Sequence, residues 1–415
     1  MTADPTATAP RRAILAWSLY DLANTVFFLL VATRYFPEQL AERTGSESAV
    51  ALTYVPAMLL SAFLSPALGA LVDRIGHARA LAFGLTLACC AATVGMAIAD
   101  GTVALALLYV AARFAYEMAA VPYNALLPAL AGAGTLGAIS GAGVALGYVG
   151  NLFAFGLILA FDLDAHGYGA LYLLAAALFI GFTLPMRFLV AEQPPTRHDP
   201  TPRRRGELLR IAFREGFAAL RRQLAPPARR AYFLGLFFVC DSVNTVLAQV
   251  ARYAARPEGL ALGPDSITWF LLGIQLSCIA GGFLFGRWSD RFGGRRATLA
   301  AVALLFAGLF VAQFAPWWGV RVAAIGTLGG AGLAGIWAAS RHWLVQLVPA
   351  HELGEAFGVY GLAQRASLLT LFPFTALVDR GAASGAGSYS GSVGVLLLAL
   401  AIGCVLLAKA PQSRS

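Results

Sequence analysis

The segment Tyr20–Val26 (YDLANTV) decides the fold of this chain, because it places a carboxylate in the first long apolar run. The same Asp-x-x-Asn-Thr-Val skeleton returns in Cys240–Val246 (CDSVNTV). The equivalent residues of the two copies are Asp21 and Asn24 in the first, and Asp241 and Asn244 in the second. An ionisable residue in an apolar run is costly and marks a candidate functional site. Its recurrence in two halves predicts a duplicated membrane protein with a site where the repeats meet.

The composition argues against a soluble enzyme or a nucleic-acid-binding protein. The 415 residues are 59% hydrophobic and 12% charged, about half the charge of a soluble domain. The net charge is +9, but most arginines fall in alternate loops, a pattern of membrane topology rather than of a phosphate-binding face. The five cysteines have no metal-ligand spacing, and no G-x-x-x-x-G-K-[ST] loop is present. We therefore expect no enzyme activity, metal, cofactor or nucleic-acid partner.

Twelve long apolar runs predict an all-α membrane protein with twelve transmembrane helices, since a backbone in lipid must satisfy its own polar groups. The predicted spans are 13–36, 50–72, 78–99, 103–128, 136–161, 168–190, 231–252, 266–286, 297–315, 320–348, 355–378 and 391–408. Most of the 30 basic residues lie on one side if the N-terminus is inside. This asymmetry predicts a multi-pass membrane protein with both termini in the cytoplasm.

A Pro- and Arg-rich break separates the halves. It predicts an N-terminal six-helix bundle over 1–190, a cytoplasmic linker over 191–230 and a C-terminal six-helix bundle over 231–415. Within the linker, apolar residues recur at helical spacing between arginines: Leu209, Phe213, Phe217, Leu220 and Leu224. This pattern predicts an amphipathic helix at the inner membrane surface, although a solvated basic linker would also explain it.

The two halves match again in their loops. Gly69–Arg79 (GALVDRIGHAR) follows the second span, and Gly286–Arg296 (GRWSDRFGGRR) follows the eighth, at nearly the interval that separates the Asp-x-x-Asn motifs. The pattern G-x-x-x-D-R-x-G-x-x-R resembles the signature of the major facilitator superfamily. The resemblance implies two six-helix pseudo-repeats and a gating role for the charged residues of the loops, through contacts made in one state and broken in another. These residues are Asp73, Arg74, Arg79, Asp290, Arg291 and Arg296.

Further matches point to one branch of that superfamily. Tyr20 with Asp21 and Asn24, Tyr123–Pro128 (YNALLP), Ser340 with Arg341, and Phe357 with Gly358 and Tyr360 resemble the vacuole-effluxer-like branch. Its members are bacterial relatives of a yeast vacuolar amino-acid exporter. The resemblance implies a central cavity surrounded by helices one, four, seven and ten.

The candidate substrate or coupling residues are the polar side chains of these apolar spans. They are Asp21, Asn24, Arg113, Tyr116, Glu117, Asn124, Asp241, Asn244, Trp337, Arg341, His342, Tyr360 and Arg365. Arg113 and Glu117 are four residues apart and therefore share one helix face. Three acids and three arginines can exchange partners, and a zwitterion could replace those partners. Asp21 or Glu117 is the expected proton carrier, and Arg113 with Arg365 the expected contacts for an anion.

Structural explanations of the same residues stay open at this stage. Asp21 and Asp241 could form polar locks between helices. Arg113 and Glu117 could satisfy each other as an intrahelical pair, and His342 could be a hydrogen-bonded core histidine.

The prediction for function is a secondary active transporter that works by alternating access. A small zwitterionic solute such as an amino acid is the expected substrate, with protons as the coupling ion, the lipid bilayer as environment and a monomer as the working unit. The alternatives are export of a sugar or a lipophilic drug-like compound, or a receptor or assembly protein of the same fold that transports nothing.

Overall fold

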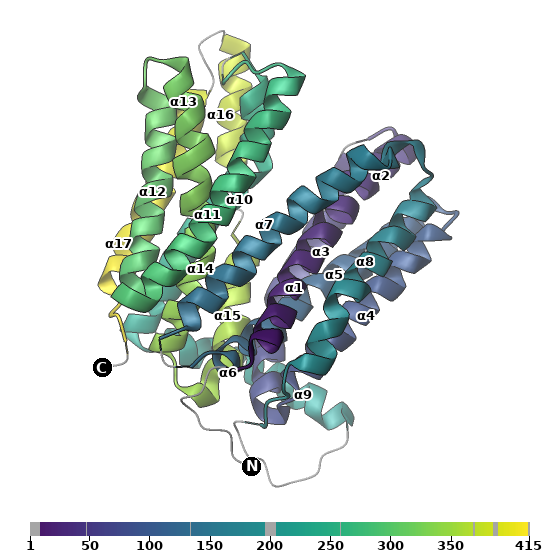
Figure 1. The fold of residues 1–415 in the computed structure, drawn as a ribbon, viewed down its shortest axis with the longest axis vertical. Coiled ribbons are helices and arrows are strands. Elements are labelled where there is room, and N and C mark those ends of the chain that lie inside the picture. Colours follow the sequence, from purple (N-terminus) through teal and green to yellow (C-terminus); the bar gives the residue numbers. More distant parts are fainter. Residues whose placement is uncertain are drawn as a thin grey trace. The chain divides into compact units, whose positions relative to one another are not determined.

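The computed structural model describes residues 9–46, 48–132, 134–195, 205–257, 259–367, 370–384 and 389–413, and all regular structure within these ranges is helical (Figure 1). The helices of the first half are α1 (Arg11–Phe27), η1 (Phe28–Tyr35), α2 (Phe36–Thr44), α3 (Ser48–Ile75), α4 (Ala78–Ala97), α5 (Thr102–Ala125), α6 (Leu127–Leu130), α7 (Leu136–Ala160), η2 (Leu163–Ala165) and α8 (Tyr168–Leu189). They are followed by α9 (Arg205–Leu224), α10 (Pro227–Ala255), α11 (Pro264–Phe292), α12 (Gly294–Phe314), α13 (Trp318–Ala324), η3 (Ile325–Gly329), α14 (Gly330–Leu347), η4 (Ala350–Glu352), α15 (Leu353–Arg365), α16 (Leu371–Ser384) and α17 (Tyr389–Lys409).

In the part of the chain that the structure describes, 11 helical stretches are long and apolar enough to cross a membrane. They are Arg11–Thr44, Leu52–Ile75, Ala78–Ala97, Thr102–Ala125, Leu136–Ala160, Tyr168–Leu189, Pro227–Ala255, Asp265–Phe292, Gly294–Phe314, Trp318–Leu347 and Gly391–Lys409. Each overlaps one predicted span, because the length of an apolar run fixes the helix that can cross a bilayer.

The prediction of one continuous helix over 355–378 is wrong. The chain forms two shorter helices there, α15 and α16, with a bend at Ala366 and no helix at Ser367 or Thr370. Apolar composition predicted a membrane span over these residues. The interruption of the helix depends on side chains of α10, a helix distant in the sequence.

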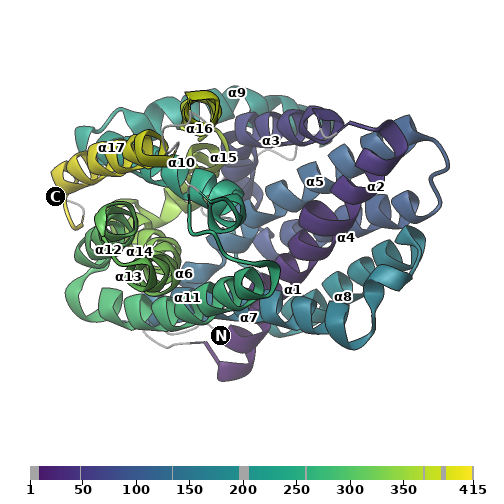
Figure 2. The same cartoon turned by 90° about the horizontal axis from the view of Figure 1, so that it is seen from above.

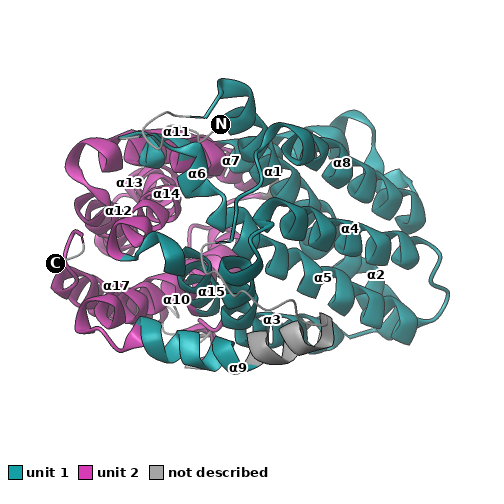
Figure 3. Ribbon diagram, turned by 90° about the horizontal axis from the view of Figure 1, so that it is seen from below, with its two compact units in different colours: residues 1–139, 146–223, 348–362 teal, residues 140–145, 224–347, 363–415 magenta. Residues whose placement is uncertain are grey.

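Two compact units make up the structure (Figure 3). Unit 1, in teal, contains residues 1–139, 146–223 and 348–362, and unit 2, in magenta, contains residues 140–145, 224–347 and 363–415. These units group residues by packing and do not follow chain order throughout. The predicted domains 1–190, 191–230 and 231–415 stay a prediction. Within the predicted linker, α9 is helical as expected, whereas residues 196–204 and the side chains of Leu209 and Phe213 lie outside what the structure describes.

Helices within each unit pack side by side through small residues. In unit 1, α4 packs against both α5 and α8, and α8 also packs against α1 (Figure 2). In unit 2, α14 packs against α11 and α12, and α10 packs against α17. A side chain at Gly332 of α14 would place its Cβ 2.6 Å from the backbone nitrogen of Leu305 on α12. Only glycine allows such close approach, and small residues of this kind drive helix packing in a bilayer.

Aromatic stacking in unit 1 fixes the start of α1 against the end of α5. The ring of Tyr123 stacks on Trp17 at 4.6 Å and on Tyr20 at 4.4 Å between centroids. Trp17 Nε1 donates to the carbonyl oxygen of Tyr123 at 3.2 Å, and the Tyr123 hydroxyl donates to the carbonyl oxygen of Trp17 at 3.2 Å. These contacts set the position of the neighbouring Asp21.

Candidate functional site

A buried ion pair lies halfway along α5. Arg113 Nη2 lies 2.6 Å from Glu117 Oε1, with the side chains only 3% and 12% exposed. Three aromatic rings surround the guanidinium, with centroids 4.7 Å away for Phe28, 5.3 Å for Tyr54 and 5.0 Å for Tyr116. Phe28 begins the π-helical segment η1, an irregularity that is frequent at functional sites. The structure thus brings together three predicted residues, Arg113, Tyr116 and Glu117, and adds Tyr54, which the sequence reasoning missed.

Two donors of Arg113 have no hydrogen-bond acceptor in the part of the chain that the structure describes. Nη2 is shared between Glu117 and the sulfur of Met58, at 3.6 Å. Nε and Nη1 are buried, and neither has an acceptor among the residues that the structure describes. Aromatic faces attract a guanidinium, but they do not accept strong hydrogen bonds as a carboxylate does. Arg113 therefore keeps the capacity to bind an additional anionic group.

The first Asp-x-x-Asn motif packs on α7. Thr25 Oγ1 donates to the carbonyl oxygen of Asp21 at 2.8 Å, and both residues border Gly147 of α7, where a Cβ would lie 3.1 Å from Thr25 Oγ1. One turn further along α7, a Cβ at Gly150 would lie 2.6 Å from the carbonyl oxygen of Leu22. The side chains of Asp21 and Asn24 are half-buried, and Asn124 is buried at the end of α5. This motif lies against an unbroken helix.

The second Asp-x-x-Asn motif holds the start of α16. Asp241 is fully buried on α10, and its Oδ2 accepts a hydrogen bond from the backbone nitrogen of Thr370 at 2.9 Å. The Thr370 hydroxyl lies 3.2 Å from the carbonyl oxygen of Asp241 and 2.9 Å from the hydroxyl of Thr245. A carboxylate at a helix N-terminus satisfies free backbone donors and interacts favourably with the helix dipole.

Asn244 holds the other side of the same interruption. Its Nδ2 donates to the carbonyl oxygen of Gln364 at 2.9 Å and lies 3.0 Å from the hydroxyl of Ser367. The predicted residue Arg365 is the last residue of α15 and is buried. The contacts of Asp241 and Asn244 favour the polar-lock interpretation for this copy of the motif, because they hold the broken backbone between α15 and α16.

The first charged loop is anchored by backbone donors. Asp73 is buried, and its Oδ1 and Oδ2 accept hydrogen bonds from the backbone nitrogens of Gly354 at 2.7 Å and Glu355 at 2.8 Å, in the first turn of α15. The next residue, Arg74, forms an ion pair with Glu215 of α9. The loop therefore connects α3 to two other helices of unit 1.

The start of α4 is held by Arg79 and Glu192, and the sequence reasoning missed Glu192. The side chain of Arg79 lies 3.3 Å from Glu192 and donates to the carbonyl oxygen of Val190 at 2.8 Å. Glu192 also accepts from the backbone nitrogens of Arg79 at 2.9 Å and Ala80 at 3.1 Å, so it caps α4. The one signal in the sequence was an isolated acid directly after the sixth apolar run.

Residues at the second charged loop lie beside a histidine of α14. His342 Nδ1 lies 2.9 Å from the Ser289 hydroxyl and 3.8 Å from Asp290 Oδ1, and its Nε2 lies 3.1 Å from Gln346 Nε2. Both ring nitrogens thus face polar groups, which favours the interpretation of His342 as a hydrogen-bonded core residue.

The arginines of this loop point outward. Arg291 is exposed and lies over the ring of Phe292 at 5.3 Å. Arg296 is exposed as well, whereas the neighbouring Arg295 donates to the carbonyl oxygen of Ala408 at 2.6 Å. Sequence matching chose Arg296 by its place in the motif, and could not show which arginine contacts another helix.

The remaining predicted residues lie on α14 and α15. Trp337 and Arg341 are half-buried on α14. Tyr360 is buried on α15, with its ring 6.1 Å from that of Phe357. Among the residues that the structure describes, no group of three or more His, Cys, Asp or Glu side chains could hold a metal ion.

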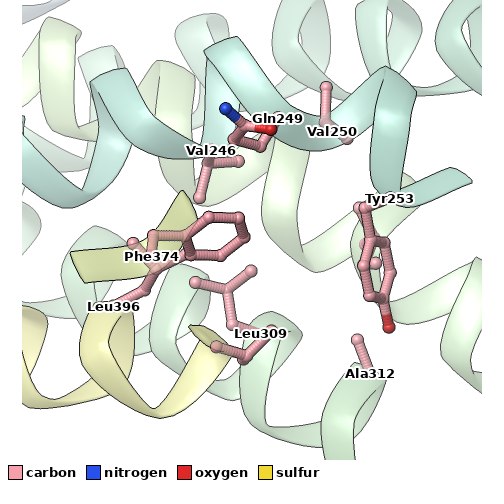
Figure 4. A pocket seen from close by; sticks show the side chains of 10 residues that line it. Val246, Gln249, Val250, Tyr253, Leu309, Ala312, Phe374 and Leu396 are labelled. Atoms are coloured by element: carbon pink, nitrogen blue, oxygen red, sulfur yellow. The ribbon is translucent and has the colours of Figure 1, made fainter. Parts of the chain in front are cut away.

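A pocket inside unit 2 is too small and too apolar to be a solute site (Figure 4). Its volume is about 40 Å³, room for only a few water molecules. None of the predicted site residues borders it. Its lining consists of Val246, Gln249, Val250, Tyr253, Leu309, Ala312, Ile325, Phe374, Val393 and Leu396. We interpret this space as a packing void between α10, α12, α16 and α17.

The sequence is similar to one family and to uncharacterised relatives. Residues 43–415 match the family described as vacuole effluxer Atg22 like. An uncharacterised MFS-type transporter of Bacillus subtilis (strain 168), YxiO, is 24% identical over 96% of this chain and 95% of its own length. An uncharacterised protein of Aquifex aeolicus (strain VF5) is 25% identical over 88% of this chain and 89% of its own length.

Solved structures of major facilitator transporters share the fold. A bacterial homologue of the iron transporter ferroportin has a TM-score of 0.72 at 17% identity, over 96% of this chain and 98% of that protein. The proton:xylose symporter XylE has a TM-score of 0.72 at 13% identity, over 97% and 96%. The human organic anion transporter MFSD10 has a TM-score of 0.69 at 15% identity, over 95% and 99%. At these identities the structural similarity confirms the predicted fold class but does not indicate a substrate.

Proposed function

The chain belongs to the vacuole effluxer Atg22-like family of major facilitator transporters, and we propose that it moves a small zwitterionic solute, such as an amino acid, by proton-coupled alternating access. It is a multi-pass membrane protein with a transporter fold rather than the fold of a soluble enzyme. We place it in the bacterial inner membrane as a monomer with both termini in the cytoplasm. The arginine bias of the loops and the bacterial relatives support this placement.

The buried pair of Arg113 and Glu117 carries the proposal. A charge at mid-span in an apolar helix is costly, and such residues in membrane proteins mark substrate and proton pathways. A solute carboxylate would accept hydrogen bonds from the free donors of Arg113, and the solute ammonium would face the carboxylate of Glu117. A zwitterion presents both groups at once, whereas a sugar presents neither.

Glu117 is also the proposed proton carrier, with Asp21 as the other candidate. A protonated Glu117 would no longer attract Arg113, so the guanidinium would become free to bind an anion. Proton uptake would thus favour capture of the solute carboxylate by Arg113, and loss of the proton would restore the Glu117 carboxylate that faces the solute ammonium. The contacts of Asp73 with α15 would be made in one state and broken in another, which is the proposed gating role of this loop.

The aromatic rings around Arg113 favour one second candidate. Phe28, Tyr54 and Tyr116 would also suit a lipophilic organic anion, which needs an arginine and apolar contacts but no partner for an ammonium group. Glu117 distinguishes the two, because only a zwitterion gains from its carboxylate. A sugar exporter or a receptor that transports nothing would need neither residue.

The test is uptake into proteoliposomes of the purified protein, with pooled radiolabelled amino acids and an imposed pH gradient. Arg113→Lys keeps the charge beside Glu117 but loses the planar fork, so we expect the KM of transport to rise about tenfold or more. Arg34→Lys is the matched control, because Arg34 lies 2.6 Å from Asp164 in a half-exposed pair. We expect its KM to stay unchanged.

A second variant separates coupling from binding. Glu117→Gln should abolish accumulation against a gradient but leave exchange of solute across the membrane. The proposal fails if Arg113→Lys transports with the wild-type KM, or if Glu117→Gln accumulates solute at the wild-type rate. If no amino acid is transported but a lipophilic anion is, the second candidate replaces the first.

A further inference from the structure

The helix of the central linker is firmly packed rather than loosely attached. A Cβ at Gly216 of α9 would lie 2.8 Å from the Cα of Ala67 on α3, so the two helices touch through their backbones. Glu215 of α9 forms an ion pair with Arg74 at the end of α3. The glycine and the ion pair together fix one face of α9 against α3 (Figure 2).

The end of α9 is fixed as well. Arg222 Nη2 lies 2.6 Å from Glu355 Oε1, and Gln223 donates to Glu352 Oε2 at 3.0 Å. The hydrogen bond to Glu355 raises the pKa of Arg222, so its guanidinium stays charged. Because Glu355 also donates its backbone nitrogen to Asp73, α9 is linked directly to the contacts of the first charged loop.

The next residue of α9, Phe217, lies at the level of the apolar span of α3. The ring of Phe217 packs edge-on against Phe63 at 5.3 Å between centroids, and Phe63 lies about 18 Å before the end of α3. Phe63 belongs to a membrane span and is 55% exposed, as Leu59 is 52% exposed, which is the pattern of a lipid-facing surface. Phe217 is 60% exposed and extends this surface onto α9.

Two exposed arginines flank Phe217 on the same face. Arg214 precedes it by three residues and Arg221 follows it by four, and both are exposed. Among the side chains that the structure describes, neither arginine takes part in an ion pair. An exposed aromatic ring between two free guanidinium groups, beside a lipid-facing helix, is the arrangement of a helix lying in the membrane interface.

We propose that Arg214, Phe217 and Arg221 form a binding surface for the headgroup of an anionic phospholipid of the membrane. The phosphate would lie between the two guanidinium groups, whose positive charges attract it, and Phe217 would contact the acyl chains. Since α9 also holds Glu355 beside Asp73, a bound lipid stabilises the packed position of α9 and with it the anchored first loop.

The test is lipid binding to the full-length protein in detergent, measured by native mass spectrometry with phosphatidylglycerol or phosphatidylcholine. Each exposed arginine near an anionic lipid contributes about 1 kcal/mol, or about fivefold in affinity. We therefore expect Arg214→Gln with Arg221→Gln to weaken phosphatidylglycerol binding about 25-fold and to leave phosphatidylcholine binding unchanged. A double variant with Arg214→Lys and Arg221→Lys should retain most of the binding.

The matched control removes two exposed arginines elsewhere, through Arg252→Gln and Arg256→Gln on and after α10. We expect it to bind phosphatidylglycerol like the wild type. Equal affinity for the two lipids, unchanged phosphatidylglycerol binding in the Arg214 and Arg221 double glutamine variant, or an equal loss in the control variant would overturn the proposal. The last measurement is the binding of inorganic phosphate. If inorganic phosphate binds as tightly as phosphatidylglycerol, the surface is a phosphate site rather than a lipid site.

Discussion

Replacing Asp73 by asparagine should release the start of α15 while changing the shape of the side chain very little. Both carboxylate oxygens of Asp73 accept backbone hydrogen bonds, from Gly354 at 2.7 Å and from Glu355 at 2.8 Å. An asparagine amide has one acceptor oxygen and one NH2 group. Whichever way the amide turns, one of the two backbone donors faces another donor.

The magnitude follows from the burial of this contact. Asp73 is 3% exposed, so the lost hydrogen bond is replaced poorly by water. A hydrogen bond to a charged group contributes about 1.5–3 kcal/mol, and the interaction of a partly buried carboxylate with a helix N-terminus up to about 2 kcal/mol. These two contributions overlap. We expect a loss of about 2–3 kcal/mol in the free energy that holds the first turn of α15, a factor of about 30 to 150.

The assay is amide hydrogen exchange, which reports local opening. In Asp73→Asn, the amides of Gly354 and Glu355 should exchange about 30 to 150 times faster than in the wild type. Asp164→Asn is the control, since this residue accepts from Arg34 at 2.6 Å in a half-exposed pair far from α15 in the sequence. Exchange at Gly354 and Glu355 that is unchanged in Asp73→Asn, or equally fast in the control, would refute the reasoning.

Three further predictions concern single contacts, each measured by thermal unfolding of the purified protein. Asp241→Ala leaves the buried backbone nitrogen of Thr370 without its acceptor and should destabilise the protein by about 1–3 kcal/mol, and an unchanged Tm would contradict the helix lock. Gly150→Ala would place a Cβ 2.6 Å from a backbone carbonyl oxygen and should cost about 1–3 kcal/mol, whereas Gly156→Ala on the same helix has open space and should be neutral or stabilising. Glu192→Ala removes the cap of α4 and should cost about 0.5–2 kcal/mol, with faster amide exchange in the first turn as its signature.

The membrane spans could be predicted well because they depend on composition alone. A run of about twenty apolar residues must become a helix in lipid, whatever packs against it. The span over 355–378 is the exception, and the reason is a tertiary one. Its interruption leaves backbone groups that are satisfied by Asp241 and Asn244, which come from a helix more than a hundred residues earlier.

The candidate residues divide in the same way. Arg113 and Glu117 could be paired from the sequence, because residues four apart share a helix face. The partners of the arginines at the other sites could not be predicted from the sequence. Glu192, Glu215 and Glu355 belong to no motif, and the packing of distant segments places them beside those arginines.

The sequence by itself determined that this chain is a duplicated helical membrane protein, because hydropathy and motif repetition are properties of the chain. Only the tertiary structure decided what each buried polar group contacts. The two Asp-x-x-Asn-Thr-Val segments show the difference. The first lies against an unbroken α7 beside Gly147, and the second holds the interrupted backbone before α16 through Thr370. A buried carboxylate must find donors, and which donors are near is set by the neighbouring helix rather than by the motif.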